Sequence, residues 1–191
     1  MSDLFHEMTE QLESTLRSGD LEECEWIVVE RIRKLPRSPF DLSIVVNISN
    51  DPADAARSFD RFLDLEAQRV KIAAAYAEMN GFYINPGLWF CDFFAYAFYG
   101  GHDDYDWLSR WQSGEFPRYP IHGMEALQAV YASARHGKKS DSDAEDMSSL
   151  LVVIKFQLFI KKAATHMKSL CFPLLITAHD FDFIAEVGPN A

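Results

Sequence analysis

Apolar residues recur every three or four positions along much of this chain, the spacing that places them on one face of an α-helix. The first such stretch covers residues 3–17. A second begins at Asp20, a residue type that commonly caps helix N-termini, and continues to about Lys34 with Trp26 and Ile32 on its inward face. Two amphipathic helices are therefore predicted at the start of the chain.

The longest helical pattern begins at Asp51 and continues to Asn80. Asp51 can cap the helix and Pro52 suits its first turn, because a proline there removes no needed hydrogen bond. Apolar residues from Phe59 to Tyr76 keep the helical spacing, and no glycine or proline interrupts them. A long helix is predicted over this stretch, and its length leaves a kink or a break open, although no residue marks the place.

The second half of the chain contains two more helical patterns, over residues 124–135 and 147–170. The later one is apolar on most faces and should therefore lie at the centre of the core. The charged segment 136–146 contains almost no apolar residue and is expected to be a flexible loop. In residues 174–187, phenylalanines alternate with aspartates at positions 180–183, as in a half-exposed β-strand.

The aromatic segment 89–99 is compatible with a strand and with a helix. In a strand, Phe90 and Phe94 would share one face, but Asp92 would lie on that face too. A helix would group the same two rings and direct Asp92 elsewhere, so both interpretations stay open. Taken together, the patterns predict a mainly α, single-domain fold over residues 1–191, similar to a helical bundle, with room for a small antiparallel β element.

The balance of charge limits the kinds of partner. The chain carries 29 acidic and 18 basic residues, a net charge of −11 at neutral pH. Such a surface repels phosphate backbones and attracts basic proteins, so we expect no nucleic-acid partner. The first residues lack the basic and apolar character of a signal peptide, and the longest apolar stretch, Leu150–Ile160, is too short to span a bilayer. A cytoplasmic protein without a membrane partner is therefore predicted.

Sequence signatures of enzymes are missing. The chain has no nucleophile elbow, no zinc-protease motif, no phosphate-binding loop and no dinucleotide-binding glycine pattern. Its three cysteines, Cys24, Cys91 and Cys171, lie far apart among apolar neighbours and are expected to be buried, reduced thiols. A catalytic function is therefore not predicted.

Two clusters of histidine and aspartate, His102–Asp106 and His179–Asp182, contain residue types that ligate metals. The first lacks the late glutamate and the internal glycine of a calcium loop. It also holds one histidine, whereas zinc needs three or four converging ligands, and nothing in the sequence shows that the two clusters meet. We expect polar turns with helix-capping aspartates, and no metal or cofactor.

The block WFCDFFAYAFYGGHDDYDWLSRWQS, residues 89–113, combines aromatic rings with acids. Its first half is expected to be core. In its second half, rings lie among charged and small polar residues, a composition typical of protein-binding hot spots. The Gly100-Gly101 pair should end the aromatic element and present the following residues as a turn. We therefore predict a binding surface for a basic protein formed by Asp103, Asp104, Tyr105, Asp106, Trp107 and Trp111.

This block resembles one found in small bacterial immunity proteins of polymorphic-toxin and contact-dependent growth inhibition systems. Those proteins often contain an aromatic W-F-x-D-x-F-A run, then YGG, acids and DWL, and the resemblance covers about 25 residues of this chain. It implies a non-catalytic cytoplasmic protein that binds and blocks one cognate toxin domain. Such toxins are commonly basic nucleases, for which a net charge of −11 has the matching sign. The resemblance implies no shared binding residues, because these interfaces diverge with their toxins.

Two hypotheses of different classes follow. The first is an immunity protein that neutralises a toxin domain by protein–protein interaction. The second is a small enzyme or ligand-binding protein with an aromatic and acidic cleft. The cleft of the second hypothesis would be lined by Tyr96, Tyr99, His102, Asp103 and Trp107. A deep enclosed pocket with converging histidine and aspartate would favour the second hypothesis.

Overall fold

The computed structural model describes residues 1–85, 87–134 and 142–188. Its helices are α1 (Asp3–Arg17), α2 (Leu21–Ile32), α3 (Pro52–Glu66), α4 (Glu125–Ala134) and α5 (Ser142–Ala164), with the 3-10 helices η1 (Pro39–Ile44) and η2 (Asp106–Arg110). Its strands are β1 (Ala74–Asn80), β2 (Phe90–Tyr96), β3 (Tyr119–Pro120), β4 (Leu174–Ala178) and β5 (Ala185–Val187).

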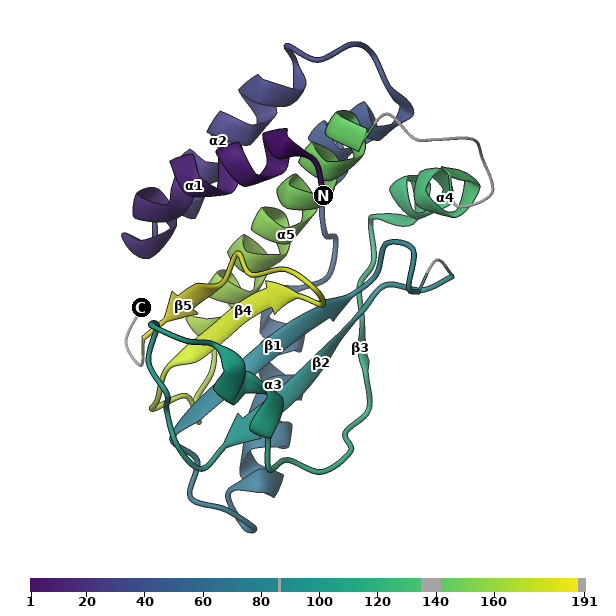
Figure 1. Cartoon of the computed structure of the whole chain (residues 1–191). Helices are drawn as coiled ribbons and strands as arrows, with labels where there is room; N and C mark the ends of the chain where they lie inside the picture. The colour runs from purple at the N-terminus through teal and green to yellow at the C-terminus, as the bar shows by residue number, and fades with distance from the viewer. Residues whose placement is uncertain (86, 135–141, 189–191) are drawn as a thin grey trace.

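The strands form one mixed sheet in the order β3-β2-β1-β4-β5 (Figure 1). β1 pairs antiparallel with β2 and parallel with β4, and the two short strands pair antiparallel at the edges. The prediction of a mainly α, bundle-like fold is therefore wrong: the chain is a mixed α/β protein built on a five-stranded sheet. A parallel pair needs a long crossover connection, which here contains α4 and α5.

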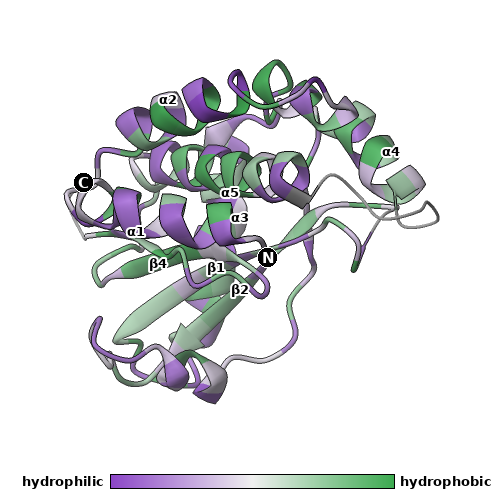
Figure 2. Ribbon diagram, turned by 45° about the horizontal axis from the view of Figure 1, so that its top comes forward, coloured by the Kyte–Doolittle hydropathy of each residue, from purple (hydrophilic) through white to green (hydrophobic). Residues whose placement is uncertain are grey.

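Helices cover one face of the sheet, as Figures 1 and 2 show. α5 contacts β4, β1 and β5, α3 lies beside it over β2, and α1 and α2 pack against α5. We call this side of the sheet the helix face. The opposite side, which we call the strap face, is crossed by residues 97–113, the strap, which includes η2. The main hydrophobic core lies between the sheet and the helices.

The predicted long helix over 51–80 is wrong in its second half. The helix α3 begins with Asp51 as its cap, as expected, because the Asp51 carboxylate accepts a hydrogen bond from the Ala53 amide at 2.9 Å. It ends at Glu66, however, and residues 74–80 form the central strand β1. Alanine is common in β1 and favours helices locally, but pairing with two neighbouring strands overrides this preference.

The expected central helix is confirmed, although its bounds are shifted toward the N-terminus. α5 runs over Ser142–Ala164 instead of 147–170, and its middle is buried on all sides. Two polar side chains inside it donate hydrogen bonds to carbonyl oxygens of neighbouring elements, although Oε1 of Gln157 has no partner among the described residues. The Lys155 ammonium donates to the carbonyl oxygens of Ser43 at 2.8 Å and Val46 at 2.6 Å, and the Gln157 amide donates to the carbonyls of β4 and of Phe183. These bonds tie α5 to η1 and to the sheet.

The Lys155 ammonium of α5 is buried, and this changes its pKa. Burial lowers the pKa of the Lys155 ammonium, and Glu25, whose Oε1 lies 4.0 Å from Nζ, opposes the shift. The carbonyl contacts explain why a charged side chain is tolerated here, since each ammonium hydrogen has an acceptor within reach. Of the charged loop expected at 136–146, residues 136–141 lie outside the described residues, and from Ser142 onward the chain is helical.

The ambiguous segment 89–99 contains the strand β2, with Phe90, Asp92 and Phe94 on one face. The presence of Asp92 beside the rings does not disfavour a strand, because this face lies opposite the helical layer. The predicted half-exposed strand at 174–187 is two buried strands, β4 and β5. The alternating residues 180–183 form the turn that joins them.

Two side chains expected inside the protein lie outside it. Trp26 on α2 is 59% exposed, because the helix turns Cys24 and Val28 toward the core instead. Cys171 is also exposed, whereas the other two cysteines are buried as expected. No helix in the described part of the chain is both long and apolar enough to cross a bilayer.

Candidate functional site

The strap is held to the sheet by Trp107, which was predicted to be an exposed contact residue. Only 6% of Trp107 is exposed, and its ring packs edge-on against Tyr96 at a centroid distance of 4.9 Å. Its indole N–H donates to the Gly101 carbonyl at 3.1 Å. A Cβ atom at Gly100 would lie 2.3 Å from the Trp107 ring, so the close approach requires glycine. The expected exposure of Trp107 is therefore wrong.

The other predicted contact residues lie at the surface to different degrees. Asp103, Asp104 and Asp106 are exposed near the middle of the strap, at the start of η2, and Tyr105 between them is half-buried. The Asp104 carboxylate accepts a hydrogen bond from the Asp106 amide at 2.8 Å, as a capping residue would. Trp111, at the other end of η2, is 51% exposed and lies 5.2 Å from the Phe94 ring, measured between centroids.

The cleft of the alternative hypothesis is not formed by its expected residues. Tyr96 is fully buried and donates its hydroxyl hydrogen to the Leu108 carbonyl at 2.9 Å, and Trp107 lies against it. His102 is exposed, with its Nε2 3.0 Å from the Tyr99 hydroxyl and 3.4 Å from a carboxylate oxygen of Glu186. These contacts fasten the strap to β5, and the buried side chains of Tyr96 and Trp107 pack against one another beneath it.

The two histidine–aspartate clusters contact different carboxylates. His102 lies against Glu186, whereas His179 Nδ1 lies 3.1 Å from Oε1 of Glu78. Within residues 1–85, 87–134 and 142–188, no group of three or more histidine, cysteine, aspartate or glutamate side chains is arranged to hold a metal ion.

An unpredicted feature lies at the middle of the strap face, where two carboxylates stand side by side. Glu78 of β1 and Asp92 of β2 are direct partners across the antiparallel pair. The Asn80 amide bridges them, donating to Oε1 of Glu78 at 3.2 Å and to Oδ2 of Asp92 at 3.1 Å. Tyr76 donates its hydroxyl hydrogen to Oε2 of Glu78 at 3.0 Å. Like charges directly opposite one another destabilise a sheet, so this arrangement needs a cation nearby or costs stability.

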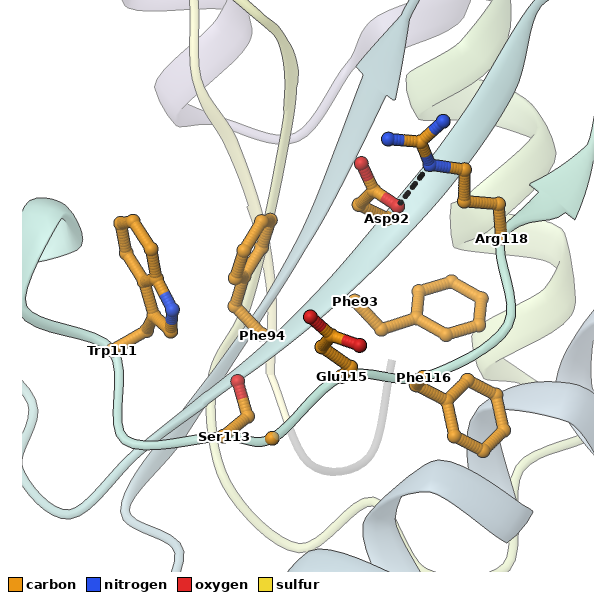
Figure 3. Close-up of a pocket in the computed structure, with 9 residues that line it drawn as sticks. Asp92, Phe93, Phe94, Trp111, Ser113, Glu115, Phe116 and Arg118 are labelled. Atoms are coloured by element: carbon orange, nitrogen blue, oxygen red, sulfur yellow. Dashed lines mark ion pairs between the residues drawn. The ribbon is translucent and has the colours of Figure 1, made fainter.

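Arg118 is the permanently charged basic residue beside this pair. Its Nε lies 3.7 Å from Oδ1 of Asp92 (Figure 3). Its guanidinium carbon lies 4.2 Å from the centroid of the Phe90 ring. Burial raises the pKa of the Asp92 carboxyl, Arg118 lowers it in part, and Glu78 raises it. The net upward shift of the pKa means that the charged carboxylate is incompletely compensated.

A pocket of about 460 Å³ opens beside Asp92 (Figure 3). Phe94 and Trp111 lie on one side of it and Phe116 and Arg118 on the other. Its remaining lining residues are Asp92, Phe93, Ser113, Gly114 and Glu115. Aromatic walls together with carboxylates give this pocket the chemistry of a site for an organic cation.

The pocket lies where residues 114–118 run apart from the edge of β2. On either side of this segment, the chain is hydrogen-bonded to that edge. On one side Cys91 pairs with Tyr119 of β3. On the other, Ser113 Oγ accepts from the Ala95 amide at 3.2 Å. Between them, no hydrogen bond joins the Phe93 backbone to residues 114–118, all of which the structure describes. At Phe93 the outer edge of β2 therefore has no hydrogen-bond partner in the segment across the pocket.

Glu66 at the end of α3 draws the segment away from β2. Its Oε1 accepts a hydrogen bond from the Gly114 amide at 3.1 Å and pairs with Arg69 at the same distance. Phe116 then inserts into the core, 5.4 Å from the Phe62 ring between centroids. These two anchors hold the outer wall of the pocket in place, so the pocket is part of the packed fold.

Sequence reasoning found Trp111 but missed the carboxylate pair and Arg118. One signal was available: Glu78 interrupts an otherwise apolar run, and Asp92 interrupts an aromatic one. These two acids can be predicted to lie side by side only if it is known that the two strands pair and that Glu78 is opposite Asp92. Compared with protein-family models, curated proteins and solved structures, the chain matches none of them.

Proposed function

We propose that the chain binds a basic protein through its strap face, and that it acts as a cytoplasmic immunity protein that neutralises a cognate toxin domain, of the basic nuclease type, by contact alone. The observation that carries this proposal is the half-exposed ring of Trp111 at a pocket lined by the carboxylates of Asp92 and Glu115. Aromatic rings with two torsions lose little entropy on binding and serve often as hot spots.

The sign of the charge supports the same proposal. A net charge of −11 attracts a basic protein over distances of about a Debye length, roughly 8–10 Å at physiological salt, and raises the rate of encounter. The acids of the strap, Asp103, Asp104 and Asp106, are exposed and suited to steering. Trp107 has a supporting role in this proposal, because its ring is buried under the strap.

The test is co-expression with the toxin domain encoded beside this gene, followed by binding kinetics on purified variants. Trp111→Ala should weaken the complex by about 2 kcal/mol, mostly through faster dissociation. The matched control is Trp26→Ala, which removes a ring of similar exposure from α2 on the opposite side of the molecule. The proposal fails if both variants protect cells and bind as the unchanged protein does.

Steering by the strap acids is tested separately. Replacing Asp103 and Asp104 by lysine should slow association and flatten its dependence on salt, with little change in dissociation. Lysines in place of Glu22 and Glu23 on α2 change the net charge by the same amount at a different site and serve as the control. Equal effects from the two pairs would show that net charge alone, and not the strap, directs the encounter.

A further inference from the structure

One guanidinium already rests on the strap face. Arg118 stacks over the Phe90 ring at 4.2 Å and places its Nε 3.7 Å from Oδ1 of Asp92. This distance is long for an ion pair, and 65% of the Arg118 side chain is exposed. Asp92 thus contacts a cation stacked on an aromatic ring but retains an incompletely paired oxygen that faces the pocket. A second guanidinium on the other side of Asp92 would meet the same combination of groups.

The pocket repeats that combination on the side of Asp92 away from Phe90. The rings of Phe94 and Trp111 lie at one wall, and Glu115 projects toward the pocket from the segment across it (Figure 3). Glu115 is exposed and forms no ion pair with any described residue. Two carboxylates and two rings therefore line a space of about 460 Å³, within the range of pockets that hold small ligands.

The geometry favours a guanidinium over an ammonium or an anion. A guanidinium is planar, weakly hydrated and able to stack on a ring while its edge donates to carboxylates, whereas an ammonium is compact and strongly hydrated. An anion would meet Asp92 and Glu115, and Arg118 is the one basic residue among the lining residues to attract it. The charge of the site thus selects a cation, and its flat aromatic wall selects a planar one.

The bare edge of β2 indicates how the cation is presented. The Phe93 backbone lies across the pocket from residues 114–118 and forms no hydrogen bond with them. Because Tyr119 and Ser113 occupy the positions on either side, this edge can bond one residue of a partner segment, while a neighbouring side chain of that segment enters the pocket. An arginine in an extended or loop segment meets both conditions.

We propose that the pocket lined by Asp92, Phe94, Trp111 and Glu115 is a receptor for an arginine side chain of the partner protein. The identity of the partner rests on the proposed function, but the chemistry of the pocket does not. It is tested without any toxin, with N-acetyl-arginine N-methylamide as the probe and the lysine and citrulline analogues for comparison. Citrulline keeps the shape of arginine and removes its charge.

Binding is followed by the chemical shifts of backbone amides and of tryptophan indoles as each probe is added to the whole protein. The arginine probe should shift the Trp111 indole and the amides of Phe93, Gly114 and Glu115, saturably and together. The lysine probe should bind at least about threefold more weakly, and the citrulline probe should cause no saturable shift. Equal binding of lysine and arginine, or shifts scattered over the surface, would overturn the proposal.

Variants assign the contacts. Trp111→Ala should weaken binding of the arginine probe by about three- to fivefold, and Asp92→Asn by about two- to threefold. The controls are Trp26→Ala and Asp182→Asn, which lie outside the pocket and should change nothing. Melting curves show whether each variant is folded.

The variant Arg118→Gln distinguishes an arginine receptor from an anion site. The two predict opposite changes in the affinity for the arginine probe. Removing Arg118 frees Oδ1 of Asp92 and removes a like charge, so the arginine probe should bind about twofold or more tightly. Weaker binding of arginine in this variant, or saturable shifts caused by phosphate in the unchanged protein, would overturn the proposal.

The two proposals fail in different ways. If the probe does not bind but the toxin complex depends on Trp111, the arginine receptor is wrong and the proposed function stands. If the probe binds at the pocket and no toxin domain binds the protein, the receptor stands and the immunity function is wrong.

Discussion

The two faces of the sheet differ although they belong to the same strands. On the helix face, Ala77, Cys91 and Ala95 are fully buried under α3 and α5. On the strap face, the intervening positions Glu78 and Asp92 are charged and half-buried. Because side chains alternate along a strand, one sequence can build a dry core on one side and a polar surface on the other. The helix face carries the main core, whereas the strap face combines a smaller buried cluster around Tyr96 and Trp107 with the two carboxylates.

Removing a ring from each face should show this difference most strongly. Phe156→Ala on α5 empties a fully buried site and should reduce the free energy of unfolding by about 3–5 kcal/mol. Trp111→Ala on the strap face should reduce it by no more than about 0.5 kcal/mol, because the ring is half exposed. Urea denaturation of both variants measures the two values. Similar losses would mean that the strap face contributes to stability as the helix face does.

A smaller effect is expected where the strap meets the sheet. Gly100→Ala would place a Cβ atom 2.3 Å from the Trp107 ring, and relieving that overlap should cost about 1–3 kcal/mol. Hydrogen exchange should then speed up in residues 97–113 and stay unchanged in α5.

Gly101→Ala is the comparison for this variant. It meets no neighbouring atom but has a φ of +80°, so its cost is limited to backbone strain of about 1–2 kcal/mol. If hydrogen exchange of the strap is unaffected by Gly100→Ala, Trp107 does not fasten the strap.

The smallest expected change in stability is a gain, whereas the variants above lose stability. Asp92→Asn should stabilise the protein at pH 7 by up to about 1 kcal/mol, because it removes one of two like charges facing across the sheet. The pKa of Asp92 is raised in the folded state, so the unchanged protein loses stability as the pH rises from about 4 through that folded-state pKa.

The asparagine variant does not titrate at this position. The gain in unfolding free energy of this variant over the unchanged protein should therefore be largest above the folded-state pKa of Asp92 and should disappear below about pH 4. Unfolding free energies measured at several pH values test this. A destabilised variant at pH 7 would mean that Arg118 already compensates the carboxylate pair.

Local signals allowed the sequence to predict the helices. Asp20 caps α2 by accepting from the Glu23 amide at 3.1 Å, and the apolar spacing of α1 and the length of apolar sequence in α5 are visible without the fold. The sheet was not predictable in this way. The composition of β1 favours a helix. It forms a strand because it pairs with β4, which lies in a distant part of the sequence.

The candidate site was predictable in part for the same reason. Trp111 was identified from its polar neighbours, which are local. Trp107 has similar neighbours, but Gly100 lets it turn inward against Tyr96, a packing detail that composition does not report. The pairing of Glu78 with Asp92 depends on the register of two strands, and Arg118 reaches Asp92 from a third segment.

The parallel pairing of β1 with β4 also has a consequence for synthesis on the ribosome. Leu174, the first partner in β4, follows Ala75 of β1 by 99 positions, an interval of about 5–20 s at ordinary rates of translation. Throughout that interval one long edge of β1 has no strand beside it, and such an edge can pair with other chains. Nascent chains that stall before residue 174 should therefore aggregate or bind chaperones, whereas release beyond β5 allows the sheet to close.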